Sequence, residues 1–240
     1  MCRTPALAAA LAACLLFAAS AIARAEMGPC RPDDHESFIC GSGNGAARVI
    51  QGTLSPSKRL ALAWRSPDGP PTEQPDDDTE ILVVRLADGA ILAKTKGSYW
   101  DTGESHVNRL EELAAWSPNS RFLIRSFNSR FSTDNIDLYA FGANDEVTGP
   151  FDLLKAIEPA VTARMKQERV KKIEGYGLFV SNEPPLKIDN RGLIRAAIMM
   201  WVPKNGPERD YKLTAQVTRG AKSLAVRIES IALTNVVAHY

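Results

Sequence analysis

The sequence predicts a mainly β fold, built of antiparallel sheets with one inserted helical segment. From Val49 onward, short apolar runs alternate with clusters of turn residues, which is the pattern of an all-β chain. A proline-initiated turn of the same type occurs twice in the first part of this region. Residues 151–172 instead have the spacing of an amphipathic helix. A two-sheet β-sandwich is the alternative arrangement of these strands.

Residues 1–25 are predicted to be a secretory signal peptide. Arg3 precedes an uncharged, alanine-rich run, and Ala23-Arg24-Ala25 has the small-x-small pattern that signal peptidase requires before Glu26. We therefore expect a periplasmic or secreted protein. Residues 11–14 also have the form of a lipoprotein cleavage site, so the alternative is a membrane-anchored lipoprotein lipidated at Cys14. The apolar run continues beyond Cys14, which favours soluble export.

The charge and the apolar stretches of the chain indicate whether nucleic acid or a membrane is an expected partner. The chain has 29 basic and 28 acidic residues and a formal net charge of +1. Because nucleic-acid phosphates require a basic patch, we expect no nucleic-acid partner. The other long apolar stretch, Leu193 to Val202, is interrupted by Arg195. No membrane span is therefore expected once the leader is removed, and an uncleaved signal anchor is disfavoured because alanine contributes little transfer energy.

Two of the four cysteines, Cys30 and Cys40, remain after signal cleavage. A pair of cysteines in an oxidising compartment predicts a disulfide, which would pin the segment 26–45. Metal ligation together with His35 is the alternative. Its spacing matches no common zinc motif, so we expect no metal and no cofactor.

Residues 46–150 contain two related copies of one pattern. The sequence LSPSKRLAL at 54–62 is echoed by WSPNSRFLI at 116–124. In both, serine and proline stand where a type I turn needs a hydrogen-bonding side chain and a preset φ. Each turn is followed by predicted strands, in order Leu60–Trp64, Ile81–Leu86, Ala90–Ala93, 122–124 and Ile136–Phe141.

This pattern resembles the WD40-like or TolB-type β-propeller repeat of exported bacterial proteins, with its Trp-Ser-Pro-Asp-x-Arg turn before a strand. The second copy has Asn119 in the aspartate position, and the first has Leu54 in place of the tryptophan. The resemblance implies blade-like, four-stranded antiparallel sheets in a partial or small propeller-like arrangement. It implies no function.

The segment 151–172 carries an apolar stripe, formed by Leu153, Ile157, Val161 and Met165. Because proline is costly inside a helix, Pro159 predicts two short helices, the second beginning at Pro159. Residues 173–240 return to strands in the same domain, expected at Tyr176–Ser181, Leu193–Val202, Tyr211–Thr218 and Ser223–Leu233. The closing residues 236–238 are expected to pair with the first sheet.

The sequence predicts no catalytic residue. Its three histidines, His35, His106 and His239, occur without a Gly-x-Ser-x-Gly elbow. Two acid pairs, Glu111/Glu112 and Asp134/Asp137, have the residue types that a glycosidase uses. Sequence alone does not give their separation.

One loop between the two copies collects aromatic and acidic side chains with a histidine. Its candidate ligand-binding residues are Trp100, Asp101, Glu104 and His106. The simpler interpretation is that Trp100 fills the space between sheets and the others are solvated. We therefore expect an exported, non-enzymatic binding or assembly module of the cell envelope, with an unknown protein or small ligand as partner. A carboxylate-dependent hydrolase, acting on glycans, is the alternative, and Cys14 lipidation would favour a structural role in the envelope.

Overall fold

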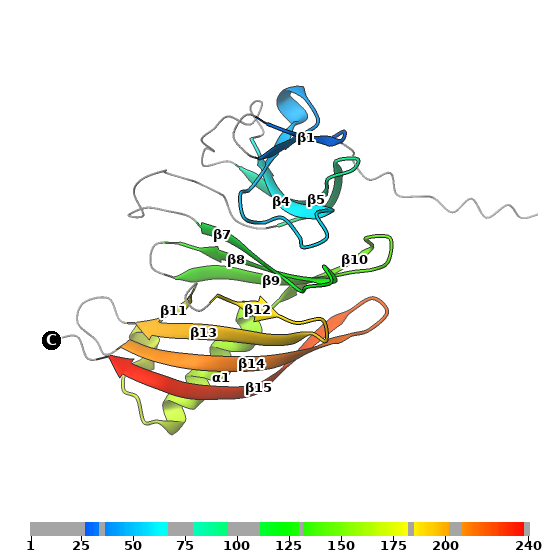
Figure 1. Ribbon diagram of the computed structural model, residues 1–240. Helices are drawn as coiled ribbons and strands as arrows, with labels where there is room; N and C mark the ends of the chain where they lie inside the picture. Colours follow the sequence, from blue (N-terminus) through cyan, green and yellow to red (C-terminus); the bar gives the residue numbers. More distant parts are fainter. Residues whose placement is uncertain are drawn as a thin grey trace, which may run out of the picture.

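The computed structural model describes residues 27–33, 37–66, 79–95, 111–129, 132–181, 185–201 and 208–237. These ranges form three antiparallel sheets and one α-helix, α1 (Leu154–Gln167). Figure 1 shows the sheets as a stack, with the N-terminal sheet above, the central sheet in the middle, and the C-terminal sheet with α1 below. The prediction of a mainly β chain with one helical segment is confirmed.

The N-terminal sheet has six strands that pair in chain order. They are β1 (Cys30–Pro32), β2 (Phe38–Cys40), β3 (Ala47–Val49), β4 (Leu60–Arg65), β5 (Glu80–Arg85) and β6 (Ala90–Lys94). A short 3-10 turn, η1 (Gly43–Gly45), connects β2 to β3.

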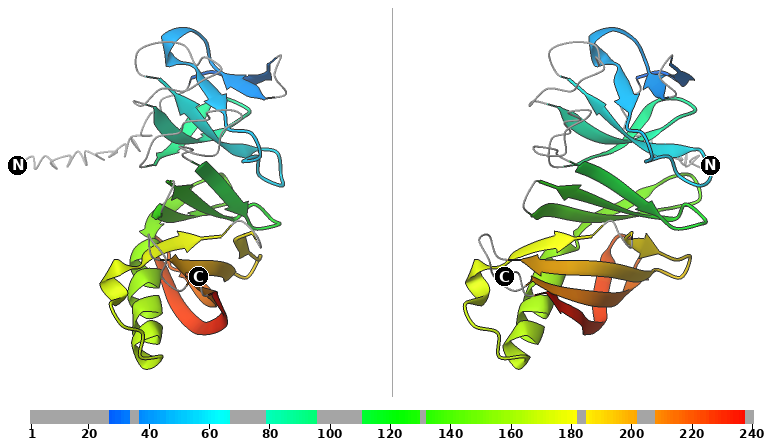
Figure 2. Two further views of the ribbon diagram at one scale, coloured as in Figure 1. Left: turned by 90° about the vertical axis from the view of Figure 1, so that its left-hand side faces the viewer. Right: turned by 60° about the vertical axis from the view of Figure 1, so that its left-hand side comes forward.

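The central sheet has four strands in the order β10-β9-β8-β7. They are β7 (Glu111–Trp116), β8 (Phe122–Asn128), β9 (Thr133–Phe141) and β10 (Val147–Asp152). Each of the first two sheets therefore contains a four-stranded antiparallel meander, β3 to β6 and β7 to β10. Figure 2 shows the two sheets stacked beside each other, and the described strands do not close into a ring of blades.

The C-terminal sheet is of a different kind, with longer strands in the order β11-β13-β14-β15 and β12 paired to β13. They are β11 (Gly177–Val180), β12 (Lys187–Ile188), β13 (Leu193–Trp201), β14 (Glu208–Arg219) and β15 (Leu224–Val237). A second 3-10 turn, η3 (Ile173–Gly175), leads from α1 into β11.

The first Ser-Pro turn leads into β4 through hydrogen bonds of Ser55. The amide of Lys58 donates to the Ser55 carbonyl at 2.8 Å, and the Ser55 amide donates to the Leu60 carbonyl at 2.8 Å. The Ser55 hydroxyl accepts the Leu60 amide at 3.0 Å. Lys58 closes the turn with a φ of 56°, in the left-handed region.

The second Ser-Pro turn repeats the same contacts ahead of β8. The Ser120 amide donates to the Ser117 carbonyl at 2.8 Å, and the Ser117 amide donates to the Phe122 carbonyl at 3.0 Å. The Ser117 hydroxyl accepts the Phe122 amide at 2.9 Å, and Ser120 has a φ of 58°. The Ser57 amide also donates to the Ser120 hydroxyl at 3.0 Å. The repeated turn is therefore also a contact between the N-terminal and central sheets.

The central sheet is buried on both faces. Leu123 and Ile124, adjacent on β8, point to opposite faces, and both are fully buried. The core toward the N-terminal sheet contains Leu60, Leu62, Trp64, Ile81, Val83, Leu123, Tyr139 and Phe141. The core toward the C-terminal sheet and α1 contains Ile124, Ile136, Leu138, Ile157, Val161, Met165, Ile194, Ile198, Tyr211 and Leu213, among others.

The predicted break at Pro159 is wrong, because α1 runs without interruption through this residue. Pro159 lies in the second turn and is exposed. It removes one helical hydrogen bond. The predicted stripe is confirmed, since Ile157, Val161 and Met165 are fully buried against the C-terminal sheet. We infer that burial of this face outweighs the cost of the proline.

The predicted pairing of the last residues with the first sheet is also wrong. Val236 and Val237 extend β15 and pair with Arg209 and Glu208 of β14. β14 and β15 are joined by a short turn, so the local hairpin register continues to the end of both strands.

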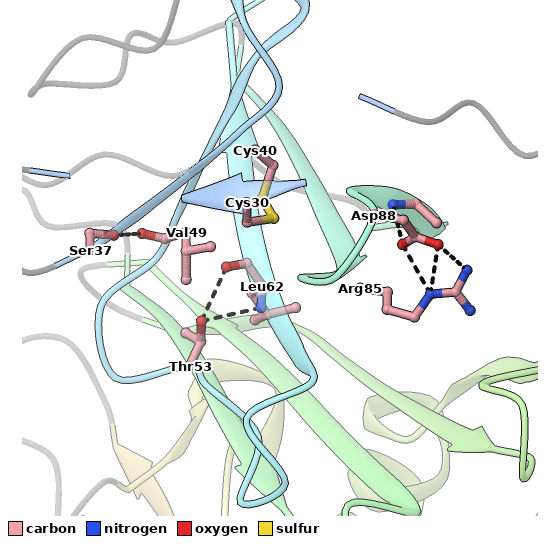
Figure 3. Close-up of a disulfide and its surroundings, with 9 residues drawn as sticks. Cys30, Ser37, Cys40, Val49, Thr53, Leu62, Arg85 and Asp88 are labelled. Carbon is pink, nitrogen blue, oxygen red and sulfur yellow. Dashed lines mark hydrogen bonds and ion pairs between the residues drawn. A yellow bond between two sulfur atoms is a disulfide. The ribbon is translucent and has the colours of Figure 1, made fainter. Parts of the chain in front are cut away.

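The predicted disulfide is confirmed between Cys30 and Cys40, which are opposite each other on β1 and β2 (Figure 3). The same segment contacts the turn between β5 and β6. The Cys30 amide donates to the Leu86 carbonyl at 2.9 Å. A Cβ at Gly89 would lie 1.9 Å from the Gly28 oxygen, so this turn requires glycine.

Candidate functional site

A buried cluster of charges lies in the central sheet, on the face toward the N-terminal sheet. Arg125 on β8 is fully buried and lies between Glu112 on β7 and Asp137 on β9. Its Nε donates to Glu112 Oε2 at 2.7 Å, and its Nη2 donates to Glu112 Oε1. Its Nη1 donates to Asn135 Oδ1 at 2.9 Å and to Asp137 Oδ2 at 3.4 Å.

Strand register brings these side chains together. Arg125 is directly opposite Asp137 in the β8–β9 pair, and Glu112 is opposite Phe127 in the β7–β8 pair. The guanidinium also lies 5.6 Å from the centre of the Phe127 ring. Because a guanidinium presents its donors as a rigid fork, one arginine can bind carboxylates on both neighbouring strands.

Burial shifts the titration of Glu112 and of the nearby Tyr139. It raises the pKa of Glu112 to about 7; Arg125 opposes the shift and the negative charge of Asp137 adds to it. Burial also raises the pKa of Tyr139, on the same face. Among the described groups, the Tyr139 hydroxyl has no hydrogen-bond partner.

The cluster contains two carboxylates, one of them with a raised pKa, which is the arrangement that acid–base catalysis needs. Both carboxylates, however, bind the same guanidinium, and Glu112 and Asp137 are each only 6% exposed. A general acid must reach a substrate atom. The contacts therefore favour a structural ion cluster.

A pocket of about 330 Å³ runs along the outer edge of β7, beside this cluster. Its walls come from the segment before β4, from β7 and β8, and from the segment before β12. The lining residues are Gln51, Gly52, Thr53, Glu112, Leu113, Ala114, Ala115, Ile124, Ser126, Pro185 and Leu186. Glu112 thus belongs to both the charge cluster and the pocket wall.

The backbone of β7 is open along this pocket. β7 is an edge strand that pairs with β8. The Ser117 amide donates to the Phe122 carbonyl, so these two residues are a hydrogen-bonded pair of the β7–β8 ladder. In an antiparallel ladder every second residue faces the partner strand in this way, and the residues between them face outward. The N–H and C=O groups of Glu112 and Ala114 therefore point away from β8. Within the described ranges, no group pairs with them.

The structure confirms one of the predicted sites and leaves the others untested. The Cys30–Cys40 disulfide is formed. The candidate ligand loop with Trp100, Asp101, Glu104 and His106 lies outside the described residues, as does Cys14. The acids Glu112 and Asp137, from two different predicted pairs, meet at Arg125.

Sequence reasoning missed Arg125, which organises the cluster. The available signal was a charged residue inside the apolar strand sequence FLIRSF at 122–127. An arginine at a core position of a strand is rarely fully buried unless it is paired.

No protein-family model, characterised protein or solved structure matches this chain significantly. In the described part of the chain, no helix is long and apolar enough to cross a membrane. The described side chains also include no cluster of three or more metal-ligating residues.

Replacing Glu112 by glutamine should weaken the pH dependence of stability between pH 4.5 and about 7. The pKa of Glu112 rises from 4.5 to about 7 on folding, so the folded state holds this proton more tightly. Glu112 therefore contributes stability that is fully present below pH 4.5 and is lost as the pH rises through 7. Urea unfolding across this range should give a shallower decline in Glu112→Gln than in the wild type.

Glu174→Gln provides the control, since Glu174 is an exposed carboxylate on η3. This variant should follow the wild-type pH profile. A Glu112→Gln profile parallel to that of the wild type would contradict the assignment.

Proposed function

We propose that this chain is an exported, non-enzymatic binding module of the cell envelope that takes an extended segment of a partner protein at the β7 edge. The observation that carries the proposal is the open backbone of β7 along a pocket that the central sheet and the segments before β4 and β12 line. An open strand edge offers hydrogen bonds to any extended peptide.

The pocket adds a basis for selectivity. A bound strand would place alternate side chains into the space bordered by Leu113, Ala115 and Leu186, while Ser126 and Gln51 provide polar groups. The β7–β8 ladder and the Glu112–Arg125 ion pair hold β7 in an extended conformation, which preorganises the edge for binding.

The Cys30–Cys40 disulfide and the leader-like residues 1–25 support the export part of the proposal. Periplasmic location and the propeller-type relationship are inferred from the sequence pattern.

A glycan-directed hydrolase is the second candidate, favoured by the raised pKa of Glu112 at the pocket wall. Turnover of a glycan panel by the purified chain, lost in Glu112→Gln, would support this candidate instead.

Ala114→Pro should abolish partner binding at the β7 edge. The substitution removes an N–H that points away from β8, a place where an edge strand tolerates proline. Cross-linking in an envelope extract should identify a protein whose capture falls by about tenfold or more in this variant, the effect expected when a strand-addition contact is blocked.

Ala114→Ser keeps the N–H and should retain the partner. Folding of both variants would be checked by circular dichroism. Equal capture by wild type, Ala114→Pro and Ala114→Ser would contradict binding at this edge.

Intact-mass measurement of the chain purified from its native envelope should give an N-terminus at Glu26. Cleavage after Ala25 is the outcome that the small-x-small pattern predicts. A diacylated Cys14 would instead establish a lipoprotein, and an intact Met1 would contradict export by this signal.

A further inference from the structure

The C-terminal sheet has one covered face and one open face. Residues such as Ile194, Ala196 and Leu213 point into the core with α1. Figure 1 shows α1 behind β13–β15, so the opposite face of this sheet is turned toward the viewer. On this open face, Lys187, Arg195 and Lys212 come from three neighbouring strands and are all exposed.

These three cations line one pocket of about 260 Å³. Its other lining residues are small or apolar: Pro185, Ala196, Ala197, Leu213 and Thr214. The pocket therefore combines an uncharged floor with positive charges at its rim.

Strand register places the three charges close together. Lys187 is directly opposite Arg195 in the β12–β13 pair. Thr214 is opposite Arg195 in the β13–β14 pair, which makes Lys212 a diagonal neighbour of Arg195 on the same face. Like charges directly opposite each other destabilise a sheet, and diagonal neighbours are about 7–8 Å apart. This arrangement lowers the stability of the sheet unless an anion compensates.

The described acids do not provide that compensation. Lys187, Arg195 and Lys212 form no ion pair with any described carboxylate. Asp189 interacts electrostatically with Arg195 without an ion pair, and its carboxylate accepts the amides of Arg191 at 2.8 Å and Leu193 at 2.9 Å.

The neighbouring register positions on β14 and β15 are mostly neutral. Thr214 and Ser230 share a hydrogen bond of 2.7 Å, and Ala232 is opposite Lys212. Asp210 lies two positions from Lys212 on the same strand, and no ion pair joins them. The rim therefore keeps an excess of positive charge.

We propose that this pocket binds the phosphate group of a small ligand. Phosphate carries more than one negative charge and several acceptor oxygens, so it can engage an arginine and two lysines at once. The volume suits a small molecule or a headgroup, because it lies below the usual range of about 300–1,000 Å³ for ligand pockets. This pocket shares only Pro185 with the pocket at the β7 edge, and the proposal does not depend on the function proposed there.

The test uses inorganic pyrophosphate titrated into the purified chain at low ionic strength, followed by isothermal calorimetry. The wild type should bind saturably. The triple variant Lys187→Gln, Arg195→Gln, Lys212→Gln should bind at least about tenfold more weakly, since each lost charge-assisted hydrogen bond is worth more than a neutral one.

A matched control removes three exposed lysines elsewhere: Lys155→Gln, Lys171→Gln, Lys222→Gln. This variant has the same net charge as the site variant and should bind as the wild type does. The site variant should also melt no lower than the wild type, because the cross-strand repulsion is removed. Ala114→Pro should leave pyrophosphate binding unchanged, which separates this proposal from the one for the β7 edge.

Vesicles of phosphatidylglycerol identify the source of the phosphate. Vesicle binding that pyrophosphate displaces would assign the site to a lipid headgroup, and pyrophosphate binding without vesicle binding would assign it to a free phosphorylated molecule. Absence of saturable pyrophosphate binding, or an equal loss in the control variant, would overturn the proposal.

Discussion

Burial of the central sheet on both faces is the constraint on which the rest of the structure depends. Antiparallel sheets commonly pack one face and leave the other to solvent. Here β8 and β9 present apolar side chains to both neighbours, Leu123 and Tyr139 on one face and Ile124 and Leu138 on the other. The N-terminal sheet therefore covers one face of the central sheet, and the C-terminal sheet with α1 covers the other.

The burial of the central sheet also encloses charged side chains, those of the Glu112–Arg125–Asp137 cluster. Charges removed from water cost free energy that pairing only partly restores, so the cluster is weak evidence for stability as such. Its value lies in specificity. A slip of one residue between β8 and β9 would turn Arg125 to the other face and leave Asp137 without it. We infer that the cluster fixes the register of β7, β8 and β9, and with it the position of the open β7 edge.

Features that depend on residues close together in the sequence can be predicted from it, whereas features that depend on packing between distant segments cannot. The Ser-Pro turns, the strands that follow them and the Cys30–Cys40 bond each depend on local chemistry. The continuity of α1 through Pro159 depends on packing against a sheet formed much later in the chain. The meeting of Glu112, Arg125 and Asp137 requires three strands in register, so the sequence showed candidate acids without the arginine that joins them. The cationic pocket likewise requires β12, β13 and β14 side by side.

The most direct test compares the unfolding free energies of Arg125→Met and of the triple variant Arg125→Met, Glu112→Gln, Asp137→Asn by urea denaturation. If the cluster is a buried, mutually compensating ion system, the single variant should lose about 3–5 kcal/mol, because it removes the guanidinium that both buried carboxylates bind. The triple variant should recover most of that loss. A single variant as stable as the wild type, or a triple variant less stable than the single one, would contradict the account.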